Sequence, residues 1–98
     1  MQFAIVAHDG KNMLEKRLKV RPRHLENMSR VNGRVLCAGG IPDDEGRMAG
    51  SVIVLDVPSR EQLDEYLASE PYIAEGVWEK VTVEKMNVVI LDGEKLKQ

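Results

Sequence analysis

Hydrophobic residues in this 98-residue chain follow two alternating periods, and the order of those periods limits the folds that the chain can adopt. A period of two is typical of strands, and a period of about 3.6 is typical of helices. Strand-like alternation occurs in four segments, at residues 2–7, 34–38, 51–57 and 77–90. Helix-like spacing occurs in two longer segments, at residues 12–32 and 59–70. The predicted order is therefore strand, helix, strand, strand, helix, strand.

Right-handed crossover connections fold such an order into a four-stranded antiparallel sheet with both helices on one face. We therefore expect an α+β fold in a single domain that spans residues 1–98, which is a normal length for one domain. The second face of the sheet then has no helix to cover it. Because a large apolar surface on a small protein usually has a partner, we expect a homodimer in which two sheets stack about a two-fold axis.

Residues that favour helix starts mark the beginnings of both helices. Asn12 with Glu15, and Ser59 with Gln62, have the spacing of capping boxes. In a capping box the first side chain accepts a hydrogen bond from the backbone three residues later. We therefore expect the helices to begin directly after Asn12 and Ser59.

The connections between the later strands are predicted from glycine, proline and charge. Segment 39–50 contains four glycines and a proline, which predicts a long and mobile loop. The last strand is expected to be either long or broken in two, and a short helical turn at 72–75 precedes it. The charged tail, residues 92–98, is expected to fray.

The composition excludes several classes of partner. The net charge is −2 and basic residues are interspersed with acidic ones, so no broad basic surface is expected for nucleic acid. No apolar tract is long enough to span a bilayer, so we expect no membrane partner. Segment 1–9 lacks a basic leader and has too short an apolar run for a secretory signal, so we expect a cytoplasmic protein.

Cys37 is the one cysteine, which excludes an internal disulfide. It lies in an apolar run with Val35, Leu36 and Ala38, which predicts a buried and unreactive thiol. A reactive thiol would need a charged neighbour that lowers its pKa. No cluster of cysteines and histidines has the spacing of a zinc site, and we expect neither a metal nor a cofactor.

Segment 15–25 gathers three arginines and a histidine in an amphipathic stretch. On one regular helix, Arg17, Arg21 and His24 lie at i, i+4 and i+7, along a single face. Pro22 complicates this arrangement, because proline inside a helix removes a hydrogen bond but is well tolerated at a helix start. The segment is therefore either a kinked helix or two short helices.

His24 is the candidate general base or acid. An imidazole can take up and return a proton near neutral pH, and such a base is usually held by a carboxylate. Two acids could hold it: Asp9, at the end of the first strand, and Glu70, at the end of the second helix. The alternative is that His24 is a half-exposed helix residue with no chemical role.

Arg17 and Arg21 are candidate substrate ligands, because a guanidinium presents a planar fork of donors to a carboxylate or an enolate. The alternative is a solvated face that pairs with Glu15. Ser51 starts a strand and is a candidate binding contact, although it lacks the Gly-x-Ser-x-Gly context of a hydrolase nucleophile. We expect four other basic side chains to be surface residues: His8, Lys16, Lys19 and Arg23.

Several short motifs occur together in the chain. The most specific is Arg-Pro-x-His-Leu at residues 21–25. The others are Asp9, Leu-Glu-Lys-Arg-Leu at residues 14–18, Ala38-Gly39, Gly50-Ser51, and Pro71-Tyr72 followed by Gly76. With these motifs, the chain resembles the YciI-like (YCII-related) family of small bacterial proteins from residue 3 to about residue 89.

The resemblance implies a ferredoxin-like β-α-β-β-α-β fold whose sheets pair into a dimeric α/β barrel. The family is similar in build to muconolactone isomerase-type proteins, its site involves a histidine and an acid, and one branch eliminates chloride from a chlorinated hydroxyquinol. His24 is therefore carried over as the catalytic residue, with Asp9 as the matching acid. Relatives commonly have aspartate where this chain has Glu70, so the resemblance ranks Asp9 above Glu70 as the partner of His24.

The leading hypothesis is a cofactor-independent enzyme of the isomerase, lyase or dehydrochlorinase type. Its substrate would be a small anionic metabolite, cyclic or aromatic, bound between the first helix and the sheet. His24 would move the proton, Asp9 or Glu70 would hold its ring, and Arg17 and Arg21 would neutralise a carboxylate or an enolate. The alternative hypothesis is a non-catalytic small-molecule binding or accessory dimeric module that uses the same pocket.

Overall fold

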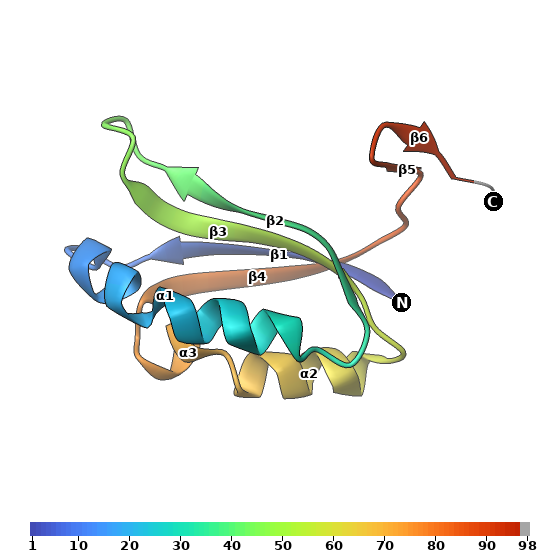
Figure 1. Cartoon of the computed structure of the whole chain (residues 1–98), viewed down its shortest axis with the longest axis horizontal. Coiled ribbons are helices and arrows are strands. Elements are labelled where there is room, and N and C mark those ends of the chain that lie inside the picture. Colours follow the sequence, from blue (N-terminus) through green and yellow to red (C-terminus); the bar gives the residue numbers. More distant parts are fainter. Residues whose placement is uncertain (97–98) are drawn as a thin grey trace.

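The computed structural model describes residues 1–96 and contains the predicted layer of helices packed on one face of a sheet (Figure 1). Four antiparallel strands form the sheet in the order β2-β3-β1-β4, and the helices lie on one face of it. The elements are β1 (Gln2–Asp9), α1 (Leu14–Ser29), β2 (Arg34–Pro42), β3 (Met48–Asp56), α2 (Arg60–Ala68), α3 (Pro71–Ala74), β4 (Trp78–Met86), β5 (Ile90–Leu91) and β6 (Glu94–Lys95). The α+β, ferredoxin-like architecture is therefore confirmed.

The core lies between the sheet and the helices. Alternate residues of β1 point into it, and Phe3 and Ile5 are almost fully buried. Their neighbours across the ladder to β3 are Leu55 and Ile53, so the same period of two buries one face of both strands. From α2, Leu63 contributes a side chain with 0% exposure. The alternation that predicts the strands thus also orients the sheet.

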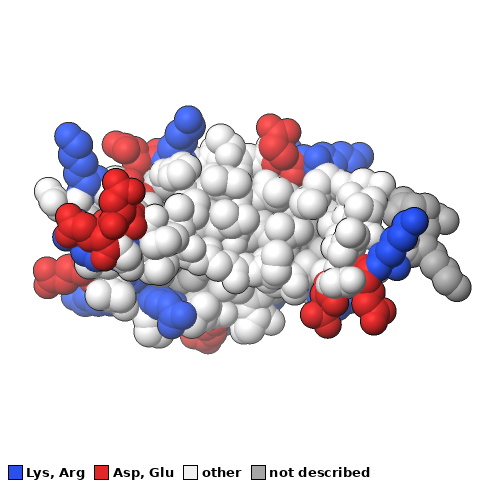
Figure 2. All heavy atoms as spheres, turned by 90° about the horizontal axis from the view of Figure 1, so that it is seen from above, with Lys and Arg blue, Asp and Glu red and all other residues white. Residues whose placement is uncertain are grey.

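The other face of the sheet carries no helix. Ala4 and Val6 of β1 lie opposite Val54 and Val52 of β3 on this open face, and all four are only partly buried. Figure 2 shows this face, where Lys, Arg, Asp and Glu side chains gather at the margins and leave the middle free of charge. We call this surface the open sheet face.

Cys37 is exposed, so the prediction of a buried thiol is wrong. Cys37 pairs with Val54, which places its side chain on the open sheet face. The apolar run around it is real, but β2 is an edge strand with a bulge between Val35 and Cys37. An apolar run in such a strand is not a sign of burial on both faces.

The predicted long loop over residues 39–50 is also wrong. Strand β2 continues to Pro42 and β3 begins at Met48, so only residues 43–47 connect them. Asp43 closes this turn, because its Oδ1 accepts hydrogen bonds from the backbone N–H groups of Glu45 (2.9 Å) and Arg47 (3.0 Å). A strand that contains several glycines can be mistaken for a loop when only the composition of the segment is considered.

The first helix begins differently from the prediction. Asn12 has a left-handed backbone with φ of 58°, the N-cap is Met13, and no side chain caps this helix. Asparagine tolerates a left-handed backbone, and in that role it cannot be an N-cap. Helix α1 then runs without a break through Pro22. At the second helix the predicted cap is confirmed, since Ser59 Oγ accepts from Gln62 N at 3.4 Å.

The chain leaves the sheet after Met86, earlier than the predicted strand over residues 77–90. Strands β5 and β6 then form a small hairpin that projects away from the body on the side of the open sheet face (Figure 1). The predicted fraying of the tail is therefore wrong for residues 92–95, and residues 97–98 lie outside the described residues. None of the helices within residues 1–96 has the length and hydropathy needed to cross a membrane.

Two glycines with positive φ allow a matched test of backbone strain. At Gly33 (φ 145°) an added Cβ would meet the backbone oxygen of Asp56, whereas at Gly46 (φ 82°) it would meet nothing. We expect Gly33→Ala to lower the free energy of unfolding by about 3 kcal/mol, because strain and a backbone clash add. We expect Gly46→Ala to cost about 1 kcal/mol. Urea denaturation of both variants measures the difference, and equal losses would show that the Asp56 carbonyl moves aside.

Candidate active site

Glu70 lies between α2 and α3 with 0% exposure, and its carboxylate is surrounded by donors. Pro71 starts α3, and Glu70 is the N-cap of that short helix, so its Oε1 accepts from the backbone N–H of Tyr72 at 3.0 Å. Its Oε2 accepts from the hydroxyl of Tyr66 at 2.9 Å. A buried carboxylate needs such partners, because desolvation otherwise penalises its charge.

His24 is the third partner of this carboxylate. Its Nδ1 lies 2.7 Å from Glu70 Oε1, and its side chain is buried in the middle of α1. Because a carboxylate is an acceptor, Nδ1 carries the proton and the second nitrogen, Nε2, has a free lone pair. No residue between 1 and 96 occupies Nε2 by a hydrogen bond. The pair thus has the arrangement of a base oriented by an acid.

Aromatic rings fix the plane of the imidazole. The ring of Tyr72 stacks on His24 with a centroid distance of 4.1 Å and an interplanar angle of 20°. The ring of Trp78 meets His24 edge-on at 5.9 Å. Burial raises the pKa of Tyr72, and the nearby charges of Arg17 and Arg21 oppose that rise. The phenol therefore stays neutral at physiological pH.

Arg17 forms a second buried charge pair, and its guanidinium lies over the ring of Tyr72, which also stacks on His24. Its Nη1 donates to both carboxylate oxygens of Asp9, at 2.8 and 3.0 Å. Its Nη2 donates to the carbonyl of Gly50 at 2.9 Å and to Ser51 Oγ at 2.8 Å. Burial raises the pKa of Asp9, and the charge and hydrogen bonds of Arg17 oppose that rise. One side chain of α1 thus connects the helix to β1 and β3.

This arrangement corrects the ranking of the two acids. Both oxygens of Asp9 are committed to Arg17, whereas Glu70 contacts His24. The preference for Asp9 as the partner of His24 is therefore wrong. Glutamate reaches one methylene further than aspartate, and the carboxylate that caps α3 from Glu70 also contacts His24 on α1.

A pocket of about 190 Å³ lies between α1, β2 and β3, beside this cluster. His24, Arg17 and Ser51 line it, and Arg21 lines it with an exposed side chain. Among residues 1–96, Arg21 has no ion-pair or hydrogen-bond partner. Neither Asp9 nor Glu70 lines this pocket, since each lies behind the basic residue that it holds. Apolar side chains complete the walls: Leu18, Leu25, Met28, Met48 and Ile53.

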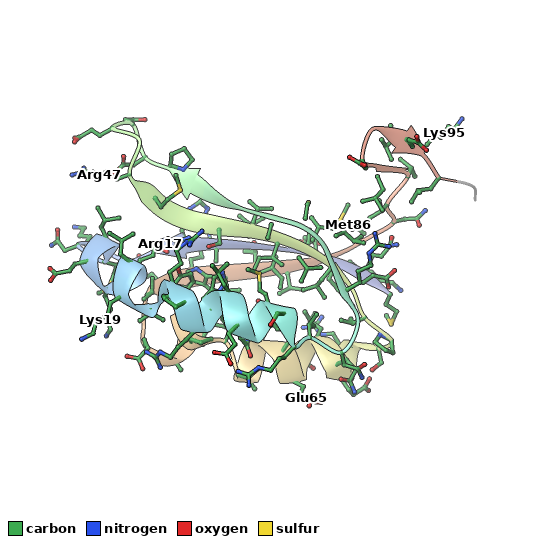
Figure 3. The ribbon with its side chains drawn as sticks, viewed as in Figure 1. Arg17, Lys19, Arg47, Glu65, Met86 and Lys95 are labelled. Atoms are coloured by element: carbon green, nitrogen blue, oxygen red, sulfur yellow. The ribbon has the colours of Figure 1, made fainter. Side chains whose placement is uncertain are left out.

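The residues expected on the surface do lie there. His8, Lys16 and Lys19 are exposed, and Arg23 is an exposed residue 3.6 Å from Glu75. Figure 3 shows Lys19 pointing away from the sheet, whereas Arg17 on the same helix points toward it. Among the described residues, no three His, Cys, Asp or Glu side chains could together hold a metal ion.

Tyr66 is the member of the cluster that the sequence reasoning missed. Its spacing with Leu63 and Leu67 is typical of the apolar face of a helix, and its ring is buried in the structure. Its position four residues before Glu70 is a signal that the two side chains can meet on one side of a helical turn. Tyr72 and Trp78 both pack against the imidazole.

Three comparisons place the chain among known proteins. The model of the YCII-related domain matches residues 1–87. Protein YciI of Escherichia coli O6:H1 is 36% identical over 97 residues, which cover 91% of this chain and 99% of that protein. An uncharacterized protein of Haemophilus influenzae is 33% identical over the same shares of the two chains.

The fold also matches a solved structure of a 5-chloro-2-hydroxyhydroquinone dehydrochlorinase, TftG, from Burkholderia phenoliruptrix AC1100. The TM-score is 0.79 with 20% identity, and the match covers 89% of this chain and 94% of that one. At this identity the likeness concerns the fold alone. The family match and the identity to YciI together show that the chain belongs to the YCII-related family.

Proposed function

We propose that this protein is an enzyme that moves a proton on a small anionic ring compound without a cofactor. One observation carries the proposal: an imidazole held by a fully buried carboxylate lines a pocket that also contains a guanidinium without a partner among the described residues. Perturbed or paired ionisable groups that line a cavity are the usual mark of a catalytic site.

His24 is the proton carrier in this proposal. Its Nε2 takes a proton from a carbon or oxygen of the substrate, and the imidazolium that forms is stabilised by Glu70 through Nδ1–H. The bonding electrons pass into the substrate as an enolate. The same proton then returns at another position, as in an isomerase, or a leaving group departs, as in a lyase or dehydrochlorinase.

Arg21 binds the negative charge of the substrate in this proposal. The charge of Arg17 is already compensated by Asp9, and its donors are used by Asp9, Gly50 and Ser51. Arg21 lies one turn further along α1 and lines the same pocket. Its guanidinium is therefore available for a carboxylate or enolate oxygen, while Ser51, which accepts from Arg17, still has a hydroxyl proton to donate.

The size of the pocket supports a single ring as the substrate. A protein cavity of about 150 Å³ is sufficient for benzene. The pocket here measures about 190 Å³ and combines apolar walls with a few polar groups. The related fold of TftG, a dehydrochlorinase, is solved in complex with 2,5-dihydroxybenzoquinone, which is a compound of one ring.

We also propose that the protein is a homodimer formed through the open sheet face. The support is the row of uncharged side chains across β1 and β3, bordered by charges (Figure 2). The dimeric α/β barrel expected from the family uses this face, and burial of such a surface stabilises association.

Removal of the imidazole tests the catalytic proposal. We expect His24→Ala to lower turnover by about 10²- to 10⁴-fold, which is the usual contribution of a general base, and to keep binding. The measurement is turnover across a panel of hydroxylated benzoquinones, chlorinated hydroquinones and cyclic carboxylates, with Lys19→Ala as the control. If the wild-type protein and His24→Ala bind a panel member equally well and the wild-type protein turns none over, the result would instead indicate the binding module.

The two arginines are expected to respond differently. Arg21→Ala should weaken binding of an anionic ligand by about 10- to 100-fold, the worth of one charge-assisted hydrogen bond, and leave the free energy of unfolding unchanged. Arg17→Met should lower that free energy by about 3–5 kcal/mol, because it leaves Asp9 buried without a partner. Calorimetric titration and urea denaturation measure both quantities. A stable Arg17→Met protein would contradict the structural role.

A charge on the open sheet face tests the dimer. We expect Val54→Asp to convert the dimer into a monomer, because the two-fold axis would bury two carboxylates together. Sedimentation velocity measures the mass, and Glu65→Lys on the exposed side of α2 is the control (Figure 3). A monomeric wild-type protein, or an unchanged Val54→Asp dimer, would contradict this proposal.

A further inference from the structure

Tyr66 is a buried phenol that directly contacts the acid of the candidate site. It lies in the last two turns of α2 with 4% exposure, and its hydroxyl donates to Glu70 Oε2 at 2.9 Å. The other oxygen of the same carboxylate accepts from His24. A single carboxylate therefore connects Tyr66 to the imidazole, although the two side chains come from different helices.

We propose that Tyr66 is a positioning residue that sets the basicity of His24 through Glu70. This inference rests on the proposed function only for the use that the protein makes of the imidazole. The effect of Tyr66 on His24 does not depend on that use. The hydroxyl of Tyr66, the carboxylate of Glu70 and the imidazole of His24 form one hydrogen-bonded chain, and all three side chains are buried.

The direction of the effect follows from how the carboxylate is held. Oε1 has two donors, His24 and the backbone of Tyr72, so the carboxylate stays in place when the donor on Oε2 is removed. A hydrogen bond at Oε2 draws negative charge away from Oε1. Tyr66 therefore weakens the attraction of the carboxylate for an imidazolium at His24.

Tyr66 can act only as a donor in this chain. Burial raises its pKa, and the charge of Glu70 and the hydrogen bond between them raise it further. The phenol thus stays protonated throughout the physiological range. The other charged groups close to His24 are Arg17 and Arg21 on its own helix, and Arg17 is balanced by Asp9 on β1. A change at Tyr66 leaves all three untouched.

The experiment follows the titration of His24 by NMR in the ligand-free protein, with the exposed His8 as internal reference. We expect Tyr66→Phe to raise the midpoint of the His24 titration by about half a pH unit, the effect of one neutral hydrogen bond. Tyr72→Phe is the matched control, because it also removes one buried hydroxyl, which donates to the Arg17 carbonyl and not to Glu70. An unchanged or lowered midpoint in Tyr66→Phe would overturn the proposal.

A second variant separates this route from a general structural effect. In Glu70→Asp the side chain is shorter by one methylene, and we expect its carboxylate to lose at least one of the two hydrogen bonds that Glu70 makes to Tyr66 and His24. We therefore expect Tyr66→Phe to leave the midpoint unchanged when it is added to Glu70→Asp. An equal rise in both backgrounds would show that the effect does not pass through the carboxylate, and would overturn the proposal.

Failure of this inference and failure of the proposed function give different results. The titration needs no substrate, so a rise in Tyr66→Phe supports the positioning role even if no panel compound is turned over. Conversely, turnover that depends on His24 with no change of midpoint in Tyr66→Phe supports the enzyme and overturns the role of Tyr66. Once a substrate is known, the upward shift of the His24 midpoint in Tyr66→Phe should also appear in the pH profile of kcat/KM.

Discussion

The buried carboxylate of Glu70 imposes the conditions that the rest of the site meets. A carboxylate removed from water is tolerated only when donors surround it. Here the donors come from three places: the side chain of Tyr66, the backbone of Tyr72 and the imidazole of His24. The stacked ring of Tyr72 and the edge of Trp78 then exclude water from the same volume. Satisfying one charge thus orients the candidate base.

The buried carboxylate of Asp9 gives the two arginines of α1 different roles. Arg17 and Arg21 differ by one turn and by sequence alone are equivalent. Arg17 turns inward and is neutralised by Asp9, and it also contacts β3 through Ser51. Arg21 lines the pocket with an exposed side chain. The first therefore supports the position of α1 against the sheet, and the second keeps a net positive charge near the pocket.

The sequence was sufficient for the fold and for most of the side chains that the structure brings together around the pocket, but it missed Tyr66 and did not determine which acid pairs with which base. Period-two alternation in β1 and β3 predicts both the strands and their buried faces. Asp9 and Glu70 are equally plausible partners of His24 in the sequence, because a choice between them needs the distance across the sheet and helix layers. Cys37 was misplaced for a related reason, since an apolar run does not tell which face of an edge strand remains uncovered.

The central position of β1 has a consequence for how the chain is made. This strand is synthesised before the other three, yet it lies between β3 and β4 and pairs with residues as late as Met86. Folding of a small domain is slowed by such distant pairings. On the ribosome, one edge of β1 therefore stays unpaired until β4 has emerged. During that interval the unpaired edge of β1 can pair with an edge of another chain, so the late strand β4 also protects the sheet from aggregation.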